Sequence, residues 1–260
     1  MSENPQTPAE RHDFILKQLQ EKGYVKVADL SDQLKVSKVT IRKDLRELEG
    51  RDLLYRTYGG ANLRDPYVGE RPLVEKVTEF AEEKKRIGRA AAELVARRES
   101  LILGPGTTMT QVAKHLPDSY SLTVITNAMN VALVLSKRNG IEILLLGGMV
   151  RHNSQSAVGV HAEDMLTGYT CDKLFLGVDG FDVEFGLTTT NSLEARLNQM
   201  MIRTAQRTVV VTDSSKFGRR GFRRICGLDE IHHVITDDNV EPRDVPPLAD
   251  VRDGRLEPAD

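Results

Sequence analysis

Residues 177–197, GVDGFDVEFGLTTTNSLEARL, combine carboxylates and hydroxyls at a spacing that could handle a small polar molecule. Asp179 and Asp182 directly follow an apolar run, and a threonine-rich stretch separates them from Glu194. The aspartates could hold sugar hydroxyls, and Glu194 could act as a general base in an aldose–ketose isomerisation. In the alternative interpretation, Glu194 and Arg196 are ordinary surface residues of a helix over 192–205. The stretch is therefore compatible with an enzyme site, a binding site or a plain helix surface.

The loop Gly104-Pro105-Gly106-Thr107-Thr108 lies between an apolar run and a predicted helix, and it could bind a phosphate. Glycine lets backbone amides approach an anion closely, the threonine hydroxyls add donors, and the helix N-terminus supplies positive potential. No lysine follows the second glycine, so the loop is not the P-loop of nucleotide-binding proteins. A purely structural turn is the alternative interpretation.

Two further polar segments follow apolar runs, namely Thr126-Asn127 and Asp213-Ser214-Ser215-Lys216. Ligands of open α/β sheets bind outside the carboxyl ends of the strands, where such segments would converge. Three polar strand ends together with one lysine favour an anionic, hydroxyl-rich ligand. The predicted effector-binding residues are Gly106, Thr107, Thr108, Thr126, Asn127, Asp179, Glu194 and Lys216.

The segment 37–49 is predicted to be a basic helix that could bind DNA. Its apolar residues Ile41, Leu45 and Leu48 recur at helical spacing, which leaves the opposite face to basic and hydroxyl side chains. A helix in the major groove reads base edges with its N-terminal side chains, while arginine and lysine neutralise phosphates. A solvated, charged helix face is the alternative. The predicted DNA-binding residues are Ser37, Lys38, Thr40, Arg42, Lys43, Arg46 and, in the next strand, Arg56.

The elements around this helix predict how it is positioned. Residues 7–10, TPAE, place a capping threonine before proline and glutamate, so a first helix should start at Pro8 and stop at Gly23. A short second helix and a turn precede the basic helix, and residues 53–57 read as a strand that leads into a wing. This order is that of a winged helix-turn-helix domain, here predicted over residues 1–63.

The rest of the chain alternates between two kinds of segment. Residues 64–75 hold two prolines and a glycine and are predicted to be a hinge, after which helical periodicity returns over 76–98. Near-continuous apolar runs alternating with helix-like stretches predict an α/β domain with a mainly parallel sheet over 76–240. Residues 241–260 are predicted to be a flexible tail. The expected strands lie at 101–103, 122–125, 141–146, 173–178, 208–211 and 233–235.

Composition narrows the classes of protein that fit. The net charge of −2 conceals a basic segment over 11–64 followed by an acidic remainder, so only the head is expected to meet a polyanion. No apolar run is long enough for a membrane helix, and we expect a cytoplasmic protein. Cys171 and Cys226 match no metal-ligand spacing, and His232 and His233 would point to opposite faces of a strand. We therefore expect neither a metal nor a cofactor.

These motifs resemble those of a known family. VSKVTIRKDLRELEGRDLLYRTYGGA resembles the DNA-binding signature of the DeoR family of bacterial transcriptional regulators. GPGTT, TN, LLLGGMVR, LFLGVDGFD, EARLNQMM and VTDSSKFG follow in the order of its sensor motifs, through about residue 238. The segment SQS at 154–156 is most similar to AgaR-type members, which govern the use of N-acetylgalactosamine and related amino sugars. The resemblance implies a sensor domain similar in fold to ribose-5-phosphate isomerase, with a phosphorylated sugar as effector.

The sequence departs from these patterns at three places. In the isomerase, a lysine and a glycine-rich run precede the catalytic glutamate, whereas this chain has GLTTT at 186–190. Without them an enediolate would lose stabilisation, so the pocket is expected to bind and not to turn over. Gly104 stands where the family usually has an aspartate, and Tyr58 replaces the usual histidine of the wing. These two changes bear on the identity of the effector and on contacts with DNA.

The sequence as a whole predicts a sugar-phosphate-responsive regulator, a repressor of a carbohydrate-utilisation operon, possibly one for amino sugars. Symmetric operators in double-stranded DNA would demand at least a dimer. One alternative is a sugar-phosphate isomerase fused to a DNA-binding domain. Another is an activator or dual regulator, which the sequence does not separate from a repressor.

Overall fold

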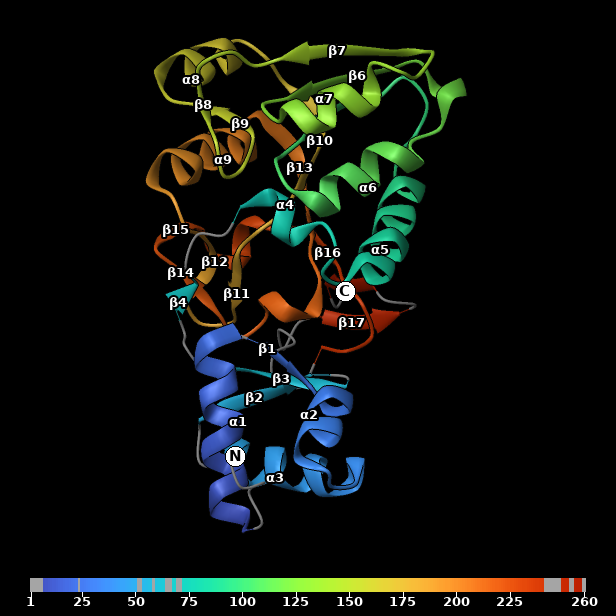
Figure 1. The fold of residues 1–260 in the computed structure, drawn as a ribbon. Helices are drawn as coiled ribbons and strands as arrows, with labels where there is room; N and C mark the ends of the chain where they lie inside the picture. The colour runs from blue at the N-terminus through green and yellow to red at the C-terminus, as the bar shows by residue number, and fades with distance from the viewer. Residues whose placement is uncertain are drawn as a thin grey trace. The chain divides into compact units, whose positions relative to one another are not determined.

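The computed structural model describes residues 7–22, 24–50, 53–57, 59–63, 67–68, 72–240, 249–252 and 255–258. Gly23, Tyr58 and parts of the predicted hinge and tail therefore lie outside the described residues. The chain divides into two compact units, Met1–Pro66 and Tyr67–Asp260 (Figure 1). No helix in the described ranges is long and apolar enough to cross a membrane.

The N-terminal unit is a winged helix-turn-helix, as the sequence predicts. The wing strands pair antiparallel in the order β1-β3-β2. Ile41, Leu45 and Leu48 are buried in a core with residues of the first two helices. The apolar spacing therefore places the basic face of the third helix outward. The elements are α1 (Pro8–Lys22), β1 (Tyr24–Lys26), α2 (Val27–Leu34), α3 (Lys38–Gly50), β2 (Leu54–Thr57) and β3 (Gly60–Leu63).

Local hydrogen bonds fix where two of these helices begin. The Thr7 amide donates to Glu10 Oε2 at 3.0 Å while the Glu10 amide donates to Thr7 Oγ1 at 3.3 Å, which confirms the capping box. The Thr40 amide donates to Ser37 Oγ at 3.1 Å and caps α3. The two helix starts are thus encoded within four residues of sequence each.

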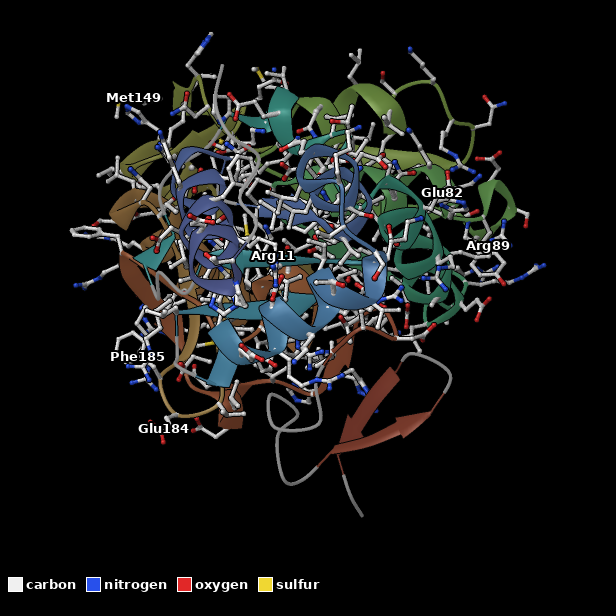
Figure 2. The ribbon with its side chains drawn as sticks, turned by 60° about the horizontal axis from the view of Figure 1, so that its bottom comes forward. Arg11, Glu82, Arg89, Met149, Glu184 and Phe185 are labelled. Carbon is white, nitrogen blue, oxygen red and sulfur yellow. The ribbon has the colours of Figure 1, made fainter. Side chains whose placement is uncertain are left out.

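A buried ion pair joins α1 to α3. The Arg11 guanidinium donates to both carboxylate oxygens of Asp44, with Nε–Oδ2 at 2.7 Å and Nη2–Oδ1 at 2.9 Å, and Arg11 lies between the two helices (Figure 2). The hydrogen bond to Asp44 raises the pKa of Arg11. Bidentate pairing of this kind fixes geometry as well as charge. The orientation of α3 against α1 therefore depends on one charged contact.

The C-terminal unit is built on a mainly parallel sheet, as predicted. Six parallel strands lie in the order β16-β13-β10-β5-β6-β7. The strands are β5 (Ser100–Leu103), β6 (Leu122–Thr126), β7 (Ile141–Leu145), β10 (Cys171–Leu176), β13 (Ala205–Val211) and β16 (His233–Ile235).

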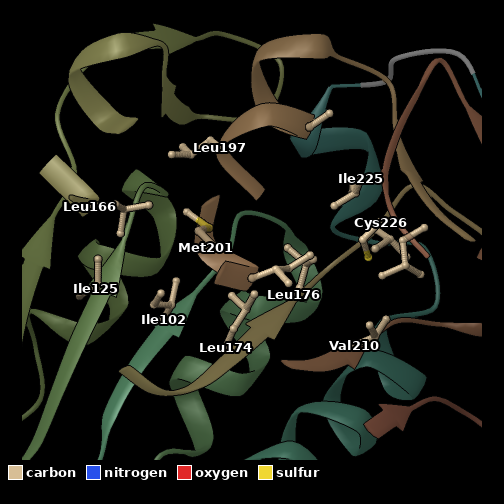
Figure 3. Packing of buried hydrophobic residues seen from close by; sticks show 14 of the residues in the cluster. Ile102, Ile125, Leu166, Leu174, Leu176, Leu197, Met201, Val210, Ile225 and Cys226 are labelled. Atoms are coloured by element: carbon tan, nitrogen blue, oxygen red, sulfur yellow. The ribbon is translucent and has the colours of Figure 1, made fainter. Parts of the chain in front are cut away.

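Helices cover both faces of this sheet because successive strand residues point to opposite sides. Leu101 and Leu103 pack with one set of helices, whereas Ile102 packs with the other (Figure 3). Met201 and Leu197 reach the second face from the last helix. The first set is α5 (Ala81–Glu93), α6 (Thr107–His115) and α7 (Met129–Leu135), and the second is α8 (Val160–Leu166) and α9 (Ser192–Thr204).

The C-terminal unit also contains short elements that the sequence patterns did not predict. They include a second antiparallel sheet in the order β11-β12-β15 and a hairpin of β8 and β9. The predicted hinge contains two of them, β4 and α4, among its described residues. These elements are β4 (Tyr67–Val68), α4 (Leu73–Lys76), β8 (Met149–Arg151), β9 (Ser156–Val158), β11 (Gly180–Asp182), β12 (Gly186–Thr189), β14 (Arg220–Gly221), β15 (Arg223–Cys226) and the 3-10 turns Asp118–Tyr120, Ser214–Lys216 and Leu228–Glu230.

The structure differs from the sequence expectation within the predicted tail. Residues Ala249–Arg252 and Arg255–Pro258 form strands β17 and β18, and β18 pairs antiparallel with β16. The charge and proline content of the segment suggested an irregular tail. The open edge of β16 offers backbone groups with which a returning strand can pair, and composition alone does not reveal such an edge.

We predict that Asp44→Ala destabilises the N-terminal unit by about 3–5 kcal/mol, because it leaves the Arg11 guanidinium buried without its counter-charge. Hydrogen exchange of the α1 and α3 amides in the full chain would measure the loss. The control is Asp32→Ala, which removes an exposed aspartate of α2. Equal exchange in the two variants would contradict a structural role for the pair.

Candidate functional site

A polar cavity lies at the carboxyl ends of the three adjacent strands β13, β10 and β5. The loops that follow these strands supply much of its wall, and α4, α5, α9 and the loop of the β8–β9 hairpin supply the rest. Six of the eight predicted effector-binding residues line it. Its polar and charged side chains are those of Lys76, Lys84, Thr107, Thr108, Asn153, Ser154, Asp179, Thr189, Thr190, Glu194, Asn198, Thr212, Asp213 and Lys216.

The first wall of the cavity is cationic. Lys84 of α5 is buried, its ammonium donates to the carbonyl oxygens of Lys76 at 2.8 Å and Glu79 at 2.7 Å, and it lies 3.9 Å from Asp213 Oδ2. Burial lowers the pKa of Lys84, and the attraction of Asp213 opposes that shift. Lys216 forms no ion pair within the described ranges. The wall thus presents one ammonium with a carboxylate 3.9 Å away and one that acts on the carboxylates at longer range.

The loop after β5 completes this wall. Gly106 adopts φ of 125°, a conformation that favours glycine, and α6 begins at the next residue. The first turn of α6, which contains Thr107 and Thr108, therefore lies at the cavity. Gly104 packs against β10 instead, because a Cβ there would lie 3.3 Å from Leu176 Cδ1.

The opposite wall is anionic, and Asp179 is its centre. Its Oδ1 accepts from the Lys76 ammonium at 2.9 Å, and its Oδ2 accepts from Thr189 Oγ1 at 2.9 Å and from the Thr190 amide at 3.3 Å. Burial alone would raise the pKa of Asp179, but the charges of Lys76 and Lys216 outweigh it and the pKa falls to about 2. Asp179 is thus an ionised carboxylate at neutral pH.

Glu194 is the second carboxylate of this wall. It is 6% exposed, and its Oε1 lies 2.9 Å from Arg151 Nη1 and accepts from Ser156 Oγ at 3.1 Å. Asn191 caps α9 and so sets the start of the helix that carries it. The interpretation of Glu194 as a surface residue is therefore wrong, whereas Arg196 is exposed and pairs with Glu163.

Thr126 and Asn127 do not reach the cavity, unlike the other predicted effector-binding residues. Thr126 Oγ1 donates to the Leu103 carbonyl at 2.7 Å, and the Asn127 amide donates to the Ala157 carbonyl at 2.9 Å. Both side chains are buried and hold neighbouring backbone segments together. Because both residues come at the end of a strand, the sequence prediction correctly put them at the carboxyl edge of the sheet. Their strand, β6, lies next to β5 and outside the three strands β13, β10 and β5 whose carboxyl ends form the cavity.

Sequence reasoning missed several residues of the cavity. Lys76 and Lys84 both lie in the predicted helical stretch 76–98, and neither follows an apolar strand. Asn153 and Ser154 enter from a hairpin loop that the apolar pattern does not reveal. Only Thr189 and Thr190 carried a usable signal, because they lie in the polar stretch between the two carboxylates.

The described residues hold no metal site. No group of three or more histidine, cysteine, aspartate or glutamate side chains in those ranges could hold a metal ion. Cys171 and Cys226 are free and buried, and burial raises the pKa of the Cys226 thiol to about 12. Both cysteines are packed in the hydrophobic core.

The basic face of α3 is a second candidate site. Ser37, Lys38, Arg42, Lys43 and Arg46 are exposed, and Thr40 is half-buried at the helix start. Arg56 of β2 is engaged within the unit, because its guanidinium donates to Glu49 Oε2 at 2.7 Å. Five of the seven predicted residues therefore lie on α3 and Ser37 caps it, while Arg56 braces that helix against the wing.

Family models match both units. The DeoR-like helix-turn-helix domain matches residues 11–66, and the DeoR C terminal sensor domain matches residues 79–238. The chain belongs to the DeoR family. It is a DNA-binding transcriptional regulator with a C-terminal sensor domain.

Relatives of this DeoR-family regulator match over most of its length. A transcriptional repressor assigned to the aga operon of Escherichia coli O157:H7 is 41% identical over 89% of this chain and 87% of its own. The glycerol-3-phosphate regulon repressor of Escherichia coli K12 is 32% identical over 88% and 90%. Ribose 5-phosphate isomerase A of Methanocaldococcus jannaschii aligns over 53% of this chain and 55% of its own, with 17% identity and a TM-score of 0.40.

We predict that Asp179 stabilises the folded regulator above about pH 4 and loses this effect as the pH falls toward 2, because its folded pKa of about 2 lies below the ordinary aspartate pKa of 3.8. The deficit in unfolding free energy of Asp179→Asn, about 2 kcal/mol, should be constant from pH 7 to pH 5 and smaller at pH 3. Urea denaturation at each pH measures it. Asp164→Asn, at an exposed position of α8, serves as the control, and a deficit that grows on acidification would refute the prediction.

Proposed function

We propose that this regulator acts in the cytoplasm as a repressor of a carbohydrate-utilisation operon and that a phosphorylated sugar bound in the cavity relieves repression. The observation that carries the proposal is the composition of the cavity, which brings lysines and a helix N-terminus together with the half-buried Asp179 and the buried Glu194. A sugar phosphate has the same division into an anionic end and a hydroxyl-bearing end. The printed names of the relatives, which refer to the aga operon and the glycerol-3-phosphate regulon, agree with this class of effector.

The cationic wall is suited to the phosphate. Lys216 forms no ion pair within 4 Å in the described ranges, although its charge lowers the pKa values of Asp179 and Asp213. The first turn of α6 presents Thr107 and Thr108 beside it in the lining. Backbone amides and the dipole at a helix N-terminus favour an anion, and a lysine adds a full charge. Lys84 contributes a second ammonium whose charge Asp213 only partly offsets at 3.9 Å. The two ammonium groups of Lys84 and Lys216 outnumber the one carboxylate of this wall, Asp213. Positive charge therefore remains to bind a dianionic phosphate.

The anionic wall is suited to hydroxyl donors. Ionised carboxylates such as Asp179 only accept hydrogen bonds, and sugar hydroxyls donate them. Asn198 and Ser154 add neutral groups that can donate or accept. Ser154 Oγ lies 2.8 Å from Ser156 Oγ, which in turn donates to Glu194. The segment 154–156 thus contributes to the cavity, and amino-sugar phosphates are the first class of effector to test.

We infer that the cavity binds its ligand without converting it. The Arg151 guanidinium lies 2.9 Å from Glu194 Oε1 and occupies the oxygen that a catalytic base would offer to the substrate. The strand β12 places Thr189 and Thr190, in place of a lysine, between the two carboxylates. The alternative function is a sugar-phosphate isomerase, and a turnover assay with pentose and hexose phosphates distinguishes the two.

We also propose that the regulator acts as a homo-oligomer on two half-sites of its operator. The sheet ends at β7, and around it a set of large apolar side chains is exposed; Leu133 is 62% exposed and Met149, at the surface in Figure 2, is 61% exposed. Monomers rarely expose contiguous apolar surface of this kind. A second copy could cover it, and light scattering that gives the monomer mass would contradict the proposal. The exposed set is Met129, Leu133, Leu145, Met149, Val150 and Val160.

We expect one phosphorylated sugar to stabilise the full-length protein in a thermal-shift panel and its unphosphorylated counterpart to leave the melting temperature unchanged. A ligand at about 100 times its dissociation constant adds about 2.7 kcal/mol of stability. The same compound should release the protein from a DNA duplex that it selects from a random-sequence pool. A panel in which every sugar phosphate leaves both readouts unchanged would overturn the proposed effector class.

We expect Arg42→Ala to weaken binding to that duplex by about 1–3 kcal/mol while leaving the thermal shift by the sugar phosphate intact, because α3 and the cavity belong to different units. Fluorescence anisotropy measures the first effect. The control is Lys17→Ala, which removes an exposed lysine of α1. Loss of both activities would indicate a folding defect and not a lost DNA contact.

A further inference from the structure

The short helix α4 is fastened to the cavity wall by three hydrogen bonds. The Leu73 amide donates to the Asn153 carbonyl at 2.7 Å, the Lys76 ammonium donates to Asp179 Oδ1 at 2.9 Å, and the Lys84 ammonium donates to the Lys76 carbonyl at 2.8 Å. Leu73 is also buried. Along the chain, α4 follows the segment that leaves the DNA-binding unit. Its position therefore depends on groups that line the cavity.

The two oxygens of Asp179 are occupied unequally. Oδ2 accepts from Thr189 Oγ1 at 2.9 Å, from the Thr190 amide at 3.3 Å and from Thr190 Oγ1 at 3.4 Å. Oδ1 accepts from Lys76. A carboxylate offers about four acceptor sites in all, so Oδ2 has little capacity left. A ligand hydroxyl that donates to Asp179 therefore approaches Oδ1, the oxygen that also accepts from Lys76.

A second contact places the same segment beside the strand that carries Thr189. Strand β4 (Tyr67–Val68) pairs parallel with β14 (Arg220–Gly221). The Gly221 amide donates to Thr188 Oγ1 at 2.7 Å, and a Cβ at Gly221 would lie only 2.6 Å from the Thr189 carbonyl. Thr189 is the residue whose hydroxyl donates to Asp179. Within residues 67–76, Lys76 thus contacts Asp179 directly, whereas β4 is connected to it indirectly, through β14 and the strand that carries Thr189.

We propose that Lys76 is the residue that reports occupancy of the cavity to the DNA-binding unit. In the unliganded protein its ammonium holds α4 on Asp179, and this is the state that binds DNA. A sugar hydroxyl that takes Asp179 Oδ1 displaces Lys76, frees α4 and alters the chain segment that joins the two units. The inference rests on the proposed function, because it takes the ligand to be a sugar phosphate. By linkage, DNA binding and ligand binding then weaken each other by the same factor.

The test needs no effector. Full-length Lys76→Met keeps the length of the side chain and removes its charge, so it should mimic the liganded state. We expect its affinity for the duplex selected by the wild-type protein to fall by about 5- to 150-fold, the range of ordinary allosteric couplings. Lys76→Arg, which can still donate to Asp179, should stay close to wild type. Lys85→Met removes an exposed lysine of α5 and controls for the lost charge.

Hydrogen exchange distinguishes release of α4 from a general loss of structure. In Lys76→Met, the amides of residues 73–77 should exchange about tenfold faster than in wild type, since their anchoring contact is gone. The amides of β5 and β10 should exchange at the wild-type rate. Faster exchange throughout the C-terminal unit would instead make Lys76 a purely structural residue and overturn the proposal.

The outcomes separate this inference from the function on which it rests. If Lys76→Met binds the duplex as tightly as wild type and Lys85→Met, the reporting role of Lys76 is refuted, whatever the sugar-phosphate panel shows. If no sugar phosphate releases the wild-type protein while Lys76→Met still loses DNA binding, the proposed effector class fails and the link through Lys76 stands. If wild type is released and Lys76→Met is weak and unresponsive to the same compound, both hold.

Discussion

Parallel strands all end at the same edge of a sheet, and the sensor unit depends on this constraint. Because β5, β10 and β13 are adjacent and parallel, the three loops that follow them meet in one place although they are far apart in sequence. The cavity needs no other element to bring together Thr107, Asp179 and Lys216. The surrounding short elements then close its sides and add the groups that the strand ends lack.

Charge balance is the second condition that the cavity meets. Buried ions are tolerated only when they are paired, and the wall residues are arranged accordingly. Arg151 lies against Glu194, Lys76 against Asp179, and Lys84 near Asp213. The pairs hold the side chains in place before any ligand arrives. An incoming anion therefore meets an ordered set of charges, and among these cavity cations Lys216 is the one that forms no ion pair in the described ranges.

The sequence was informative wherever the signal was local. Apolar periodicity predicted all six parallel strands and the core face of α3, and the pair Thr7 and Glu10 predicted a helix start, because these features depend on neighbours within a few residues. The cavity was predictable where a strand end carried its residues. Lys76 and Lys84 were missed because only tertiary packing brings them there. Thr126 was included wrongly, since spacing does not show which strand ends share a cavity.

The double use of Asp179 has a consequence for how this regulator can evolve. A substitution that changes what Asp179 recognises also changes what holds Lys76, so sugar preference and the response to the sugar are inherited together at that position. Ser154 and Asn198 line the same cavity, and within the described ranges neither forms a hydrogen bond with α4. Divergence toward a new sugar is therefore freest at those two residues. The family can broaden its range of signals there without rebuilding the switch.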